Sequence, residues 1–241
     1  MKIEITKRHL DALFKIIGDR VKVDSIIKRN EALGIETIAS FDKEYPECFL
    51  EIGDEKPSVI FALGNLELLK AENKVAVIGA RKADRNGNAA AYQLGAEYAR
   101  KGCVVVSGLA LGCDAAAHQG CLDAKGGTIA IVATGLDLTH PHENEPLQKA
   151  ILRNGGLLIS EQILGVKANP SRLVARNRLQ AALSDPVVVA QCPEHSGTMY
   201  TVRFAQQYKK RVLAVKFPYS NDLSSGNNLL IETGQAEAIK I

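Results

Sequence analysis

The sequence has no apolar run long enough to cross a membrane. No stretch approaches about 18 uncharged apolar residues, whereas a membrane-spanning helix needs about 20. Residues 1–15 also lack the apolar centre of a secretion signal. With 46% hydrophobic and 24% charged residues, the composition is that of an ordinary globular protein. These features exclude a membrane-spanning chain and a disordered one.

Cysteine is scarce and forms no recognisable pattern. The chain has five cysteines in 241 residues, an odd number, and no Cys-x-x-Cys pair. They are Cys48, Cys103, Cys113, Cys121 and Cys192. A chain of this length can bury a core without disulfides or a structural metal. We therefore expect reduced thiols and a cytoplasmic protein.

Familiar cofactor and catalytic motifs are also missing. No Gly-x-Gly-x-x-Gly follows the first buried strand and no phosphate-binding P-loop motif is present, which argues against dinucleotide and nucleoside-triphosphate sites of those types. The one close histidine pair, His140 and His142, has no metal-ligating neighbours. No nucleophile–base set can be assigned from spacing, and His118 is expected to be a core histidine. We predict no metal, no cofactor and no catalytic residue.

Charge is unevenly distributed along the chain. The formal net charge is +3, but residues 1–70 carry −2 and residues 71–241 carry +5. Two segments of the basic part, 167–183 and 203–216, contain no acidic residue. Their cations are Lys167, Arg172, Arg176, Arg178, Arg203, Lys209, Lys210, Arg211 and Lys216. Two such segments suggest an anionic partner, and a solvated surface is the simpler explanation when the charge runs are taken alone.

Residues 1–40 have the pattern of a helical segment. Leu10, Leu13 and Ile17 recur at helical spacing, and a second helix is predicted over 23–33. Residues 41–72 are less regular, with prolines as breakers and one short predicted strand at 59–63. We place a boundary at residue 40, between an N-terminal helical segment, 1–40, and a main domain, 41–241.

From Lys74 onward, short apolar runs alternate with helical patterns. The runs cover residues 74–79, 103–108, 128–133, 156–160, 186–190 and 211–215. The helical patterns cover residues 88–101, 114–125, 143–153, 178–183 and 197–208. Strands that are apolar on both faces and separated by helices form a parallel sheet covered on both sides. The predicted fold is therefore α/β, an extended Rossmann-like, mostly parallel and doubly wound sheet with a short N-terminal helical segment.

The loops after these strands form the predicted ligand site, because ligands bind beyond the carboxyl ends of such strands. Small residues in these loops let the backbone approach a ligand, and helix N-termini provide amides for phosphate. Arg81, directly after the first strand, has the fork that pairs with phosphate. Turn formation explains any one loop, whereas for five converging loops turn formation and an anion site are both open. The small residues are Gly79, Ser107, Gly108, Ser196, Gly197 and Thr198.

Six motifs, taken in order, resemble those of one family. They are Gly79-Ala80-Arg81, SGLALGCDAAAH at 107–118, GLDLTHPHEN at 135–144, LISE at 158–161, Arg176-Asn177-Arg178 and Ser196-Gly197-Thr198. Together they resemble the DNA-processing protein A family, also called DprA or Smf, over residues 45–235. The resemblance implies an extended Rossmann domain that binds single-stranded DNA, dimerises and loads the recombinase RecA during natural transformation. No catalytic activity is established for that family.

The resemblance also implies which residues contact DNA. Arg81 matches the arginine of the family's Gly-Ser-Arg motif, and Arg176 and Arg178 match its Arg-Asn-Arg motif. Arginine pairing with phosphates predicts an affinity that falls with salt. With 5% aromatic residues and no tryptophan, a long stacking platform is not expected. Ion pairing inside the fold, to Glu161 or Asp185, is the alternative for Arg176 and Arg178.

Several positions depart from the family pattern. The serine of Gly-Ser-Arg is Ala80, and Leu173-Val174 replaces a Phe-Pro pair. His142 occupies a position that is often lysine, so it is expected to be a weaker phosphate contact at neutral pH. The chain ends at Ile241, which leaves no room for the winged-helix domain of many members. These departures indicate a minimal or divergent member.

A second hypothesis comes from another class of protein. Phosphoribohydrolases similar to the LOG cytokinin-activating enzymes have a PGGxGTxxE motif after a strand. Here Pro193, Gly197 and Thr198 match it, but the paired glycines and the glutamate are missing. That glutamate is the expected general acid or base, so hydrolysis is disfavoured and a nucleotide-binding sensor stays open. A protein-interaction adaptor is the third hypothesis.

Overall fold

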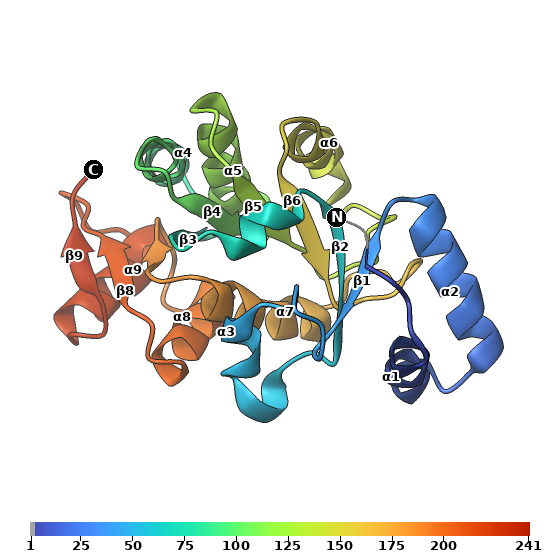
Figure 1. Ribbon diagram of the computed structural model, residues 1–241. Helices are drawn as coiled ribbons and strands as arrows, with labels where there is room; N and C mark the ends of the chain where they lie inside the picture. Colours follow the sequence, from blue (N-terminus) through green and yellow to red (C-terminus); the bar gives the residue numbers. More distant parts are fainter. Residues whose placement is uncertain (1–2) are drawn as a thin grey trace.

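The six apolar runs form the central strands of one sheet, as predicted. In the computed structural model, which describes residues 3–241, the strands of these runs are β3 (Lys74–Ile78), β4 (Val104–Ser107), β5 (Thr128–Ile131), β6 (Leu157–Ser160), β7 (Val187–Val189) and β8 (Val212–Val215). Each is buried on both faces because helices pack on both sides (Figure 1). Val75 and Val77 face one helical layer, and Ala76 and Ile78 face the other.

The strand order defines where the sheet can hold a ligand. Within residues 3–241 the order is β1-β2-β6-β5-β4-β3-β7-β8-β9, and all neighbours from β6 to β9 are parallel. The chain proceeds outward from β3 to β6, then returns to β7 on the other side of β3. Ala76 pairs with Val187 and Ile78 with Val189 at this reversal. A topological switch point therefore lies between β3 and β7.

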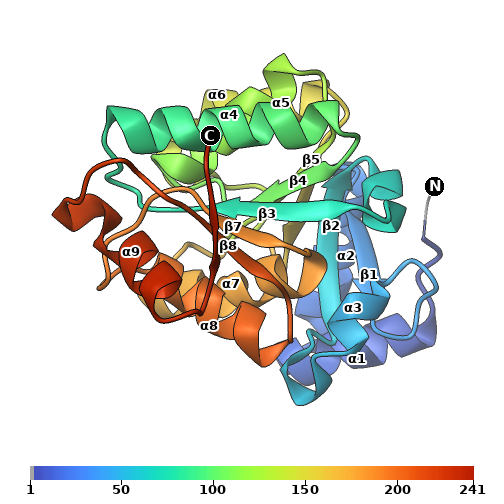
Figure 2. The ribbon, with the colours of Figure 1, turned by 90° about the vertical axis from the view of Figure 1, so that its left-hand side faces the viewer.

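Two helical layers cover the sheet. Helices α4 (Arg85–Arg100), α5 (Cys113–Asp123) and α6 (Glu145–Arg153) lie on one face (Figure 1). The other face carries α3 (Glu47–Leu50), α7 (Pro170–Leu183) and α8 (Thr198–Gln207), with α9 (Ser225–Glu232) beside β8 (Figure 2). In residues 3–241, none of the helices combines the length and the apolar character needed to span a membrane. The predicted fold class is confirmed.

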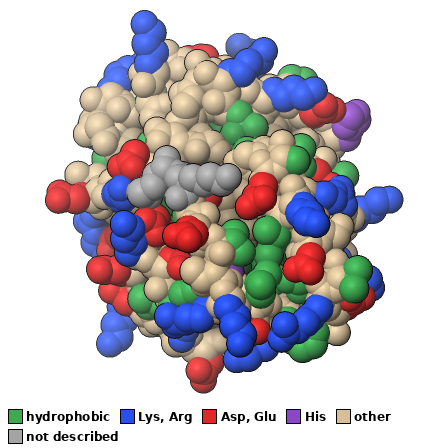
Figure 3. Space-filling view, turned by 45° about the vertical axis from the view of Figure 1, so that its right-hand side comes forward, with side chains coloured by type: hydrophobic (Ala, Val, Ile, Leu, Met, Phe, Trp, Pro, Cys, Tyr) green, Lys and Arg blue, Asp and Glu red, His purple; other side chains and the backbone are tan. Residues whose placement is uncertain are grey.

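The N-terminal segment contains two helices, as its pattern predicted, and one strand that the sequence did not predict. Helices α1 (Lys7–Ile17) and α2 (Arg20–Ala32) are followed by β1 (Glu36–Ala39), which pairs antiparallel with β2 (Val59–Gly64). Because β2 pairs antiparallel with β6, the segment continues the main sheet. The boundary at residue 40 stays a prediction. The face turned forward in Figure 3 intermixes basic, acidic and apolar side chains, as expected for a part of the chain with nearly balanced charge.

Helix α7 is longer than its sequence pattern predicted. The pattern indicated a helix over 178–183, whereas α7 begins at Pro170. Asn169 caps it, because its side-chain oxygen accepts a hydrogen bond from the amide of Arg172 at 2.8 Å. Proline is well suited to the first helical position, where no backbone donor is needed. Arg176 and Arg178 therefore both lie on a helix, two residues apart.

Helices α4 and α5 cross at close range through glycines. A Cβ atom on Gly95 would overlap the carbonyl oxygen of Ala117, and one on Gly120 would overlap the carbonyl oxygen of Tyr92. The contacting atoms are backbone, so they cannot move aside as a flexible side chain would. The two helices can cover β3 and β4 in this arrangement only if both positions lack a side chain.

A larger residue at Gly95 should therefore destabilise the fold. We expect Gly95→Val to lower the free energy of unfolding by about 3 kcal/mol through overpacking. Urea denaturation followed by circular dichroism measures this. Gln93→Val, at an exposed position of the same helix, is the control and should change stability by less than about 0.5 kcal/mol. Equal losses in the two variants would contradict the close-crossing explanation.

Candidate functional site

A cavity of about 500 Å³ lies at the switch point. The loop after β3, residues 79–82, forms one wall, and the loop after β7, residues 193–198, forms another. The first turns of α7 and α8 complete it, and Ala110 and Asp114 add the contribution of the loop after β4. Of the predicted site residues, the cavity is lined by Gly79, Arg81, Arg176, Ser196, Gly197 and Thr198.

Arg176 is the central cation of this cavity. Its side chain is only 5% exposed, and its guanidinium group lies against Gly108, where any Cβ atom would overlap Nη1. The ten ion pairs within 4 Å among residues 3–241 do not include it. Gln180, one turn further along α7, presents an amide whose oxygen accepts a hydrogen bond from Arg176 Nε at 3.2 Å when it faces the guanidinium. Arg176 thus has a neutral partner but no counter-ion at contact distance.

Asp114 is the carboxylate that influences Arg176 from further away. It accepts hydrogen bonds from the amides of Gly108 at 3.2 Å and Ala110 at 3.4 Å. Burial raises the pKa of Asp114, and the charge of Arg176 opposes that rise. Burial lowers the pKa of Arg176 to about 10, Asp114 opposes the change and Arg81 adds to it. Arg176 therefore remains a cation at neutral pH.

Arg81 supplies a second, exposed cation at the same cavity. The loop that carries it is fixed by two backbone hydrogen bonds of Ala80, whose amide donates to Gln191 at 2.7 Å and whose carbonyl accepts from Cys113 at 3.2 Å. Within the described chain, Arg81 has no carboxylate partner within 4 Å. Two arginines that repel each other and lack carboxylate partners form a site suited to an anion.

The N-terminus of α8 forms the third part of the site. Ser196 and Thr198 line the cavity beside the exposed Gly197, and Asn177 donates a hydrogen bond to the carbonyl of Gly197 at 3.3 Å. The N-terminal end of a helix carries partial positive charge, which favours an anion in this part of the cavity. The amides of Met199 and Tyr200 already donate to the carbonyls of Ser196 and Gly197, at 3.1 and 3.2 Å.

The other predicted residues lie outside this cavity. Ser107 is buried, and its hydroxyl donates to the carbonyl of Val77 at 2.7 Å. Gly108 lies beneath Arg176 and contributes space rather than a contact surface. His142 is on a short 3₁₀ turn, with its side chain 87% exposed, and pairs with Glu145 at 3.2 Å. The structure therefore gives Ser107 and Gly108 supporting positions and separates His142 from the cavity.

Arg178 is engaged inside the fold. Its guanidinium group donates to both carboxylate oxygens of Glu161, at 2.6 and 2.5 Å, and its Nε donates to the carbonyl of Glu55 at 2.8 Å. The side chain is 13% exposed and is absent from the cavity lining. This is the Glu161 ion pair that the sequence left open as the alternative. Arg176 and Arg178 thus point to different surroundings.

Sequence reasoning missed several residues of the cavity. Leu173, Val174 and Asn177 of α7 line it, as do Asp114 and Lys82. Asn177 could have been found, since it lies between the two arginines of the motif. Asp114 belongs to the SGLALGCD motif and is buried. It is the acidic residue of an otherwise basic cavity lining, and it favours the charged form of Arg176.

His118 from the same motif is fully buried, as a core histidine should be. Its Nδ1 donates to the hydroxyl of Thr128 at 2.7 Å, and that hydroxyl donates in turn to the carbonyl of Val105. Burial, with a contribution from the charge of Arg176, lowers the pKa of His118 to about 3. The imidazole is therefore neutral at physiological pH and adds no positive charge to the site.

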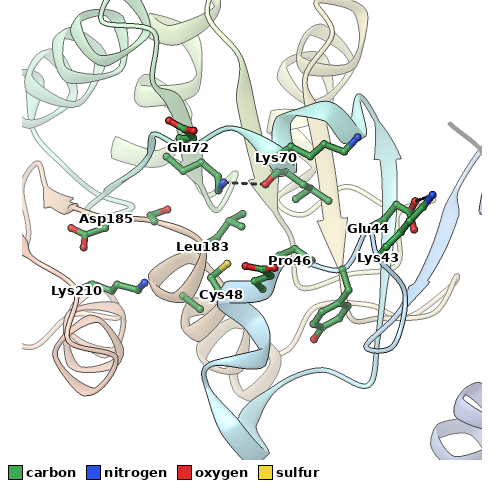
Figure 4. Close-up of a pocket in the computed structure, with 15 residues that line it drawn as sticks. Lys43, Glu44, Pro46, Cys48, Lys70, Glu72, Leu183, Asp185 and Lys210 are labelled. Carbon is green, nitrogen blue, oxygen red and sulfur yellow. Dashed lines mark hydrogen bonds and ion pairs between the residues drawn. The ribbon is translucent and has the colours of Figure 1, made fainter.

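A second cavity, of about 430 Å³, lies at the amino ends of β3 and β7, whereas the first lies beyond their carboxyl ends (Figure 4). Lys210 points across it towards Cys48. Lys74 donates a hydrogen bond to the carbonyl of Leu69 at 3.0 Å, and Asp185 pairs with Arg211 at 3.4 Å. Its basic and acidic residues are balanced in number, so it is less suited to an anion than the cavity at the switch point. Among residues 3–241, no group of three or more His, Cys, Asp or Glu side chains could hold a metal ion.

Comparison with known proteins gives consistent relatives. The family model of DNA recombination-mediator protein A matches residues 36–241. DNA processing protein DprA of Bacillus subtilis is 34% identical over 218 residues, which are 90% of this chain and 72% of that protein. Protein Smf of Synechocystis is 32% identical over 90% of this chain, and the chain spans 54% of that relative's length.

Solved structures agree with the sequence comparison. DNA processing protein A from Streptococcus pneumoniae superposes with a TM-score of 0.81 at 33% identity, covering 92% of this chain and 75% of that one. The Helicobacter pylori protein, whose structure is described for its single-stranded DNA binding mode, has a TM-score of 0.75 at 34% identity, covering 85% and 90%. A molybdenum cofactor binding protein from Rippkaea orientalis, at 23% identity and a TM-score of 0.51, shares the fold alone. The chain belongs to the DNA recombination-mediator protein A family, as its motifs had indicated.

Proposed function

We propose that this chain binds single-stranded DNA in the cavity at the β3–β7 switch point and acts as a recombination mediator. The observation that carries the proposal is Arg176, a buried cation with no carboxylate within 4 Å among residues 3–241, beside Arg81, an exposed cation that also has none there. A phosphate of the DNA backbone supplies the missing counter-ion. The binding mode described for the Helicobacter pylori relative supports the same ligand.

The site favours backbone contact over recognition of sequence. Arginine forks and helix amides bind phosphate oxygens, which are the same for every nucleotide. The cavity also has apolar walls from Leu173 and Val174, where a sugar or base can pack. We propose Arg81, Arg176, Gly79, Ser196, Gly197 and Thr198 as the residues that contact the strand, with Ser107 and Gly108 supporting them.

Reversing the exposed charge should remove strand binding without unfolding the protein. We expect Arg81→Glu to weaken binding of a dT20 oligomer at least tenfold, because it places a carboxylate beside the phosphate position. The wild-type affinity should fall with salt, with a slope of about −0.7 in log units for each phosphate contact. Fluorescence anisotropy at several salt concentrations measures both quantities. A matched duplex should bind more weakly.

Arg153→Glu is the matched control for this measurement. It makes the same change of charge at an exposed position of α6, which lies on the face of the sheet opposite α7 and α8. Unchanged affinity in folded Arg81→Glu, or an equal loss in Arg153→Glu, would reject the proposed cavity. Binding of AMP without binding of dT20 would instead favour the nucleotide-sensor hypothesis. Release of ribose phosphate from AMP would favour the hydrolase.

The two arginines of the Arg-Asn-Arg motif should separate into different roles. We propose that Arg176 binds the strand and that Arg178 stabilises the fold, so Arg176→Gln should weaken dT20 binding at least tenfold. Arg178→Gln leaves Glu161 partly buried without its partner, and we expect a loss of about 2 kcal/mol in the free energy of unfolding. Its strand affinity, measured below its unfolding midpoint, should stay within twofold of wild type. The opposite pattern would return Arg178 to the DNA-binding set.

The mediator role requires a recombinase and, by family resemblance, a homodimer. We propose that a dimer of this chain loads a RecA-type recombinase onto the strand that it protects. The chain should then shorten the delay before RecA hydrolyses ATP on a strand coated with single-strand-binding protein, and Arg81→Glu should not. An unchanged delay argues against loading, and light scattering that returns the mass of one chain at micromolar concentration argues against the dimer.

A further inference from the structure

One exposed aromatic side chain lies beside the cavity and has no role in the core. Tyr200 is 43% exposed and belongs to the first turn of α8. Its amide donates to the carbonyl of Gly197 at 3.2 Å, and Gly197, Thr198 and Thr201 all line the cavity. Tyr200 therefore lies within one helical turn of residues that bound the proposed phosphate site, and its own side chain lies outside the cavity lining.

Arg203 lies over the ring of Tyr200. Its guanidinium carbon is 5.5 Å from the ring centroid, and the two residues are three apart on α8, which places them on the same helical face. A cation over an aromatic face limits the positions that the ring can take. Arg203 is exposed and is absent from the ion pairs within 4 Å that the described chain forms.

The charges around this pair are favourable for an anionic strand. The segment 203–216 contains no acidic residue. Two acids from other elements contact residues of this segment, and both are engaged there: Glu55 accepts hydrogen bonds from Gln207 and Tyr208, and Asp185 pairs with Arg211. Glu194 is the one exposed carboxylate of the loop before α8. An exposed aromatic ring with an unpaired arginine is the combination that single-strand-binding surfaces use.

We propose that Tyr200 stacks on a base of the single strand as it leaves the cavity, with Arg203 contacting the adjoining phosphate. The inference rests on the proposed function, because the strand must first be held at Arg81 and Arg176. Every base has an aromatic face, so stacking at this position adds affinity without sequence preference. It places one stacking position on a chain whose few aromatic residues do not form a long platform.

Tyr92 provides a matched control for an exposed tyrosine. It is 40% exposed, but it lies on α4, in the other helical layer, and its hydroxyl donates to Asp123 at 2.8 Å. None of the four cation–aromatic contacts of the described chain involves it. A general effect of removing a surface tyrosine should therefore be equal at Tyr92 and Tyr200, whereas stacking should be specific to Tyr200.

The first experiment compares binding of a dT12 oligomer with binding of an abasic strand of the same length. We expect Tyr200→Ala to weaken dT12 binding roughly tenfold, Tyr200→Phe to keep it, and Tyr92→Ala to leave it unchanged. The abasic strand should bind wild type and Tyr200→Ala alike, since it offers no base to stack. The salt slope should be unchanged in Tyr200→Ala and smaller in Arg203→Gln, which loses a phosphate contact.

A second measurement uses the absence of tryptophan from the chain. Tyr200→Trp introduces a single tryptophan, whose fluorescence dT12 should quench on binding. The tryptophan of Tyr92→Trp should show no change in fluorescence. Salt-sensitive binding by wild type with no loss in Tyr200→Ala, or with equal losses in the two alanine variants, would overturn the stacking inference and leave the proposed function standing. Absence of dT12 binding by wild type would overturn both.

Discussion

The cavity depends on a buried guanidinium group that the fold does not neutralise at contact distance. Removing a charge from water costs several kcal/mol unless other groups compensate. For Arg176 the compensation is partial. Gln180 offers an amide oxygen, and Asp114 acts from beyond 4 Å while its Oδ2 accepts hydrogen bonds from the amides of Gly108 and Ala110. The guanidinium group of Arg176 lines the cavity with part of its charge uncompensated. In the proposed function, a phosphate would be its counter-ion there.

This arrangement explains why the motif residues have the types they do. Gly108 lacks a side chain because the guanidinium occupies that space. Asp114 accepts hydrogen bonds from two amides of the loop after β4, and it lies near Arg176 without forming an ion pair within 4 Å among residues 3–241. His118 is buried neutral, so it adds no competing positive charge. The motif at residues 107–118 thus surrounds the guanidinium group of Arg176 with a glycine, a carboxyl group and a neutral histidine.

The sequence could predict the sheet because burial on both faces leaves a clear apolar run in each central strand. It could not predict β1 or β9 (Glu237–Ile239), since a short edge strand shows no such run. The start of α7 was missed for a related reason. Leu173 and Val174 line the cavity rather than the core, so the apolar spacing of a core-facing helix is absent there. On a helix, side chains two residues apart point in directions that differ by about 200° around the helix axis. This is why Arg176 and Arg178 have different surroundings. Because the sequence pattern did not place Arg176 on a helix, it could not predict that difference.

The pairing of β3 with β7 has a consequence for how the site comes into being. These strands pair residues 76–78 with residues 187–189, so the paired residues lie far apart in the sequence. Contacts between positions so distant in sequence form slowly, because closing the loop costs entropy before the contact returns any stability. The loop after β7 reaches the cavity only when this pairing is complete. During synthesis, a nascent chain that has already folded β3 to β6 therefore lacks the cavity wall formed by residues 193–198 until β7 and this loop have left the ribosome.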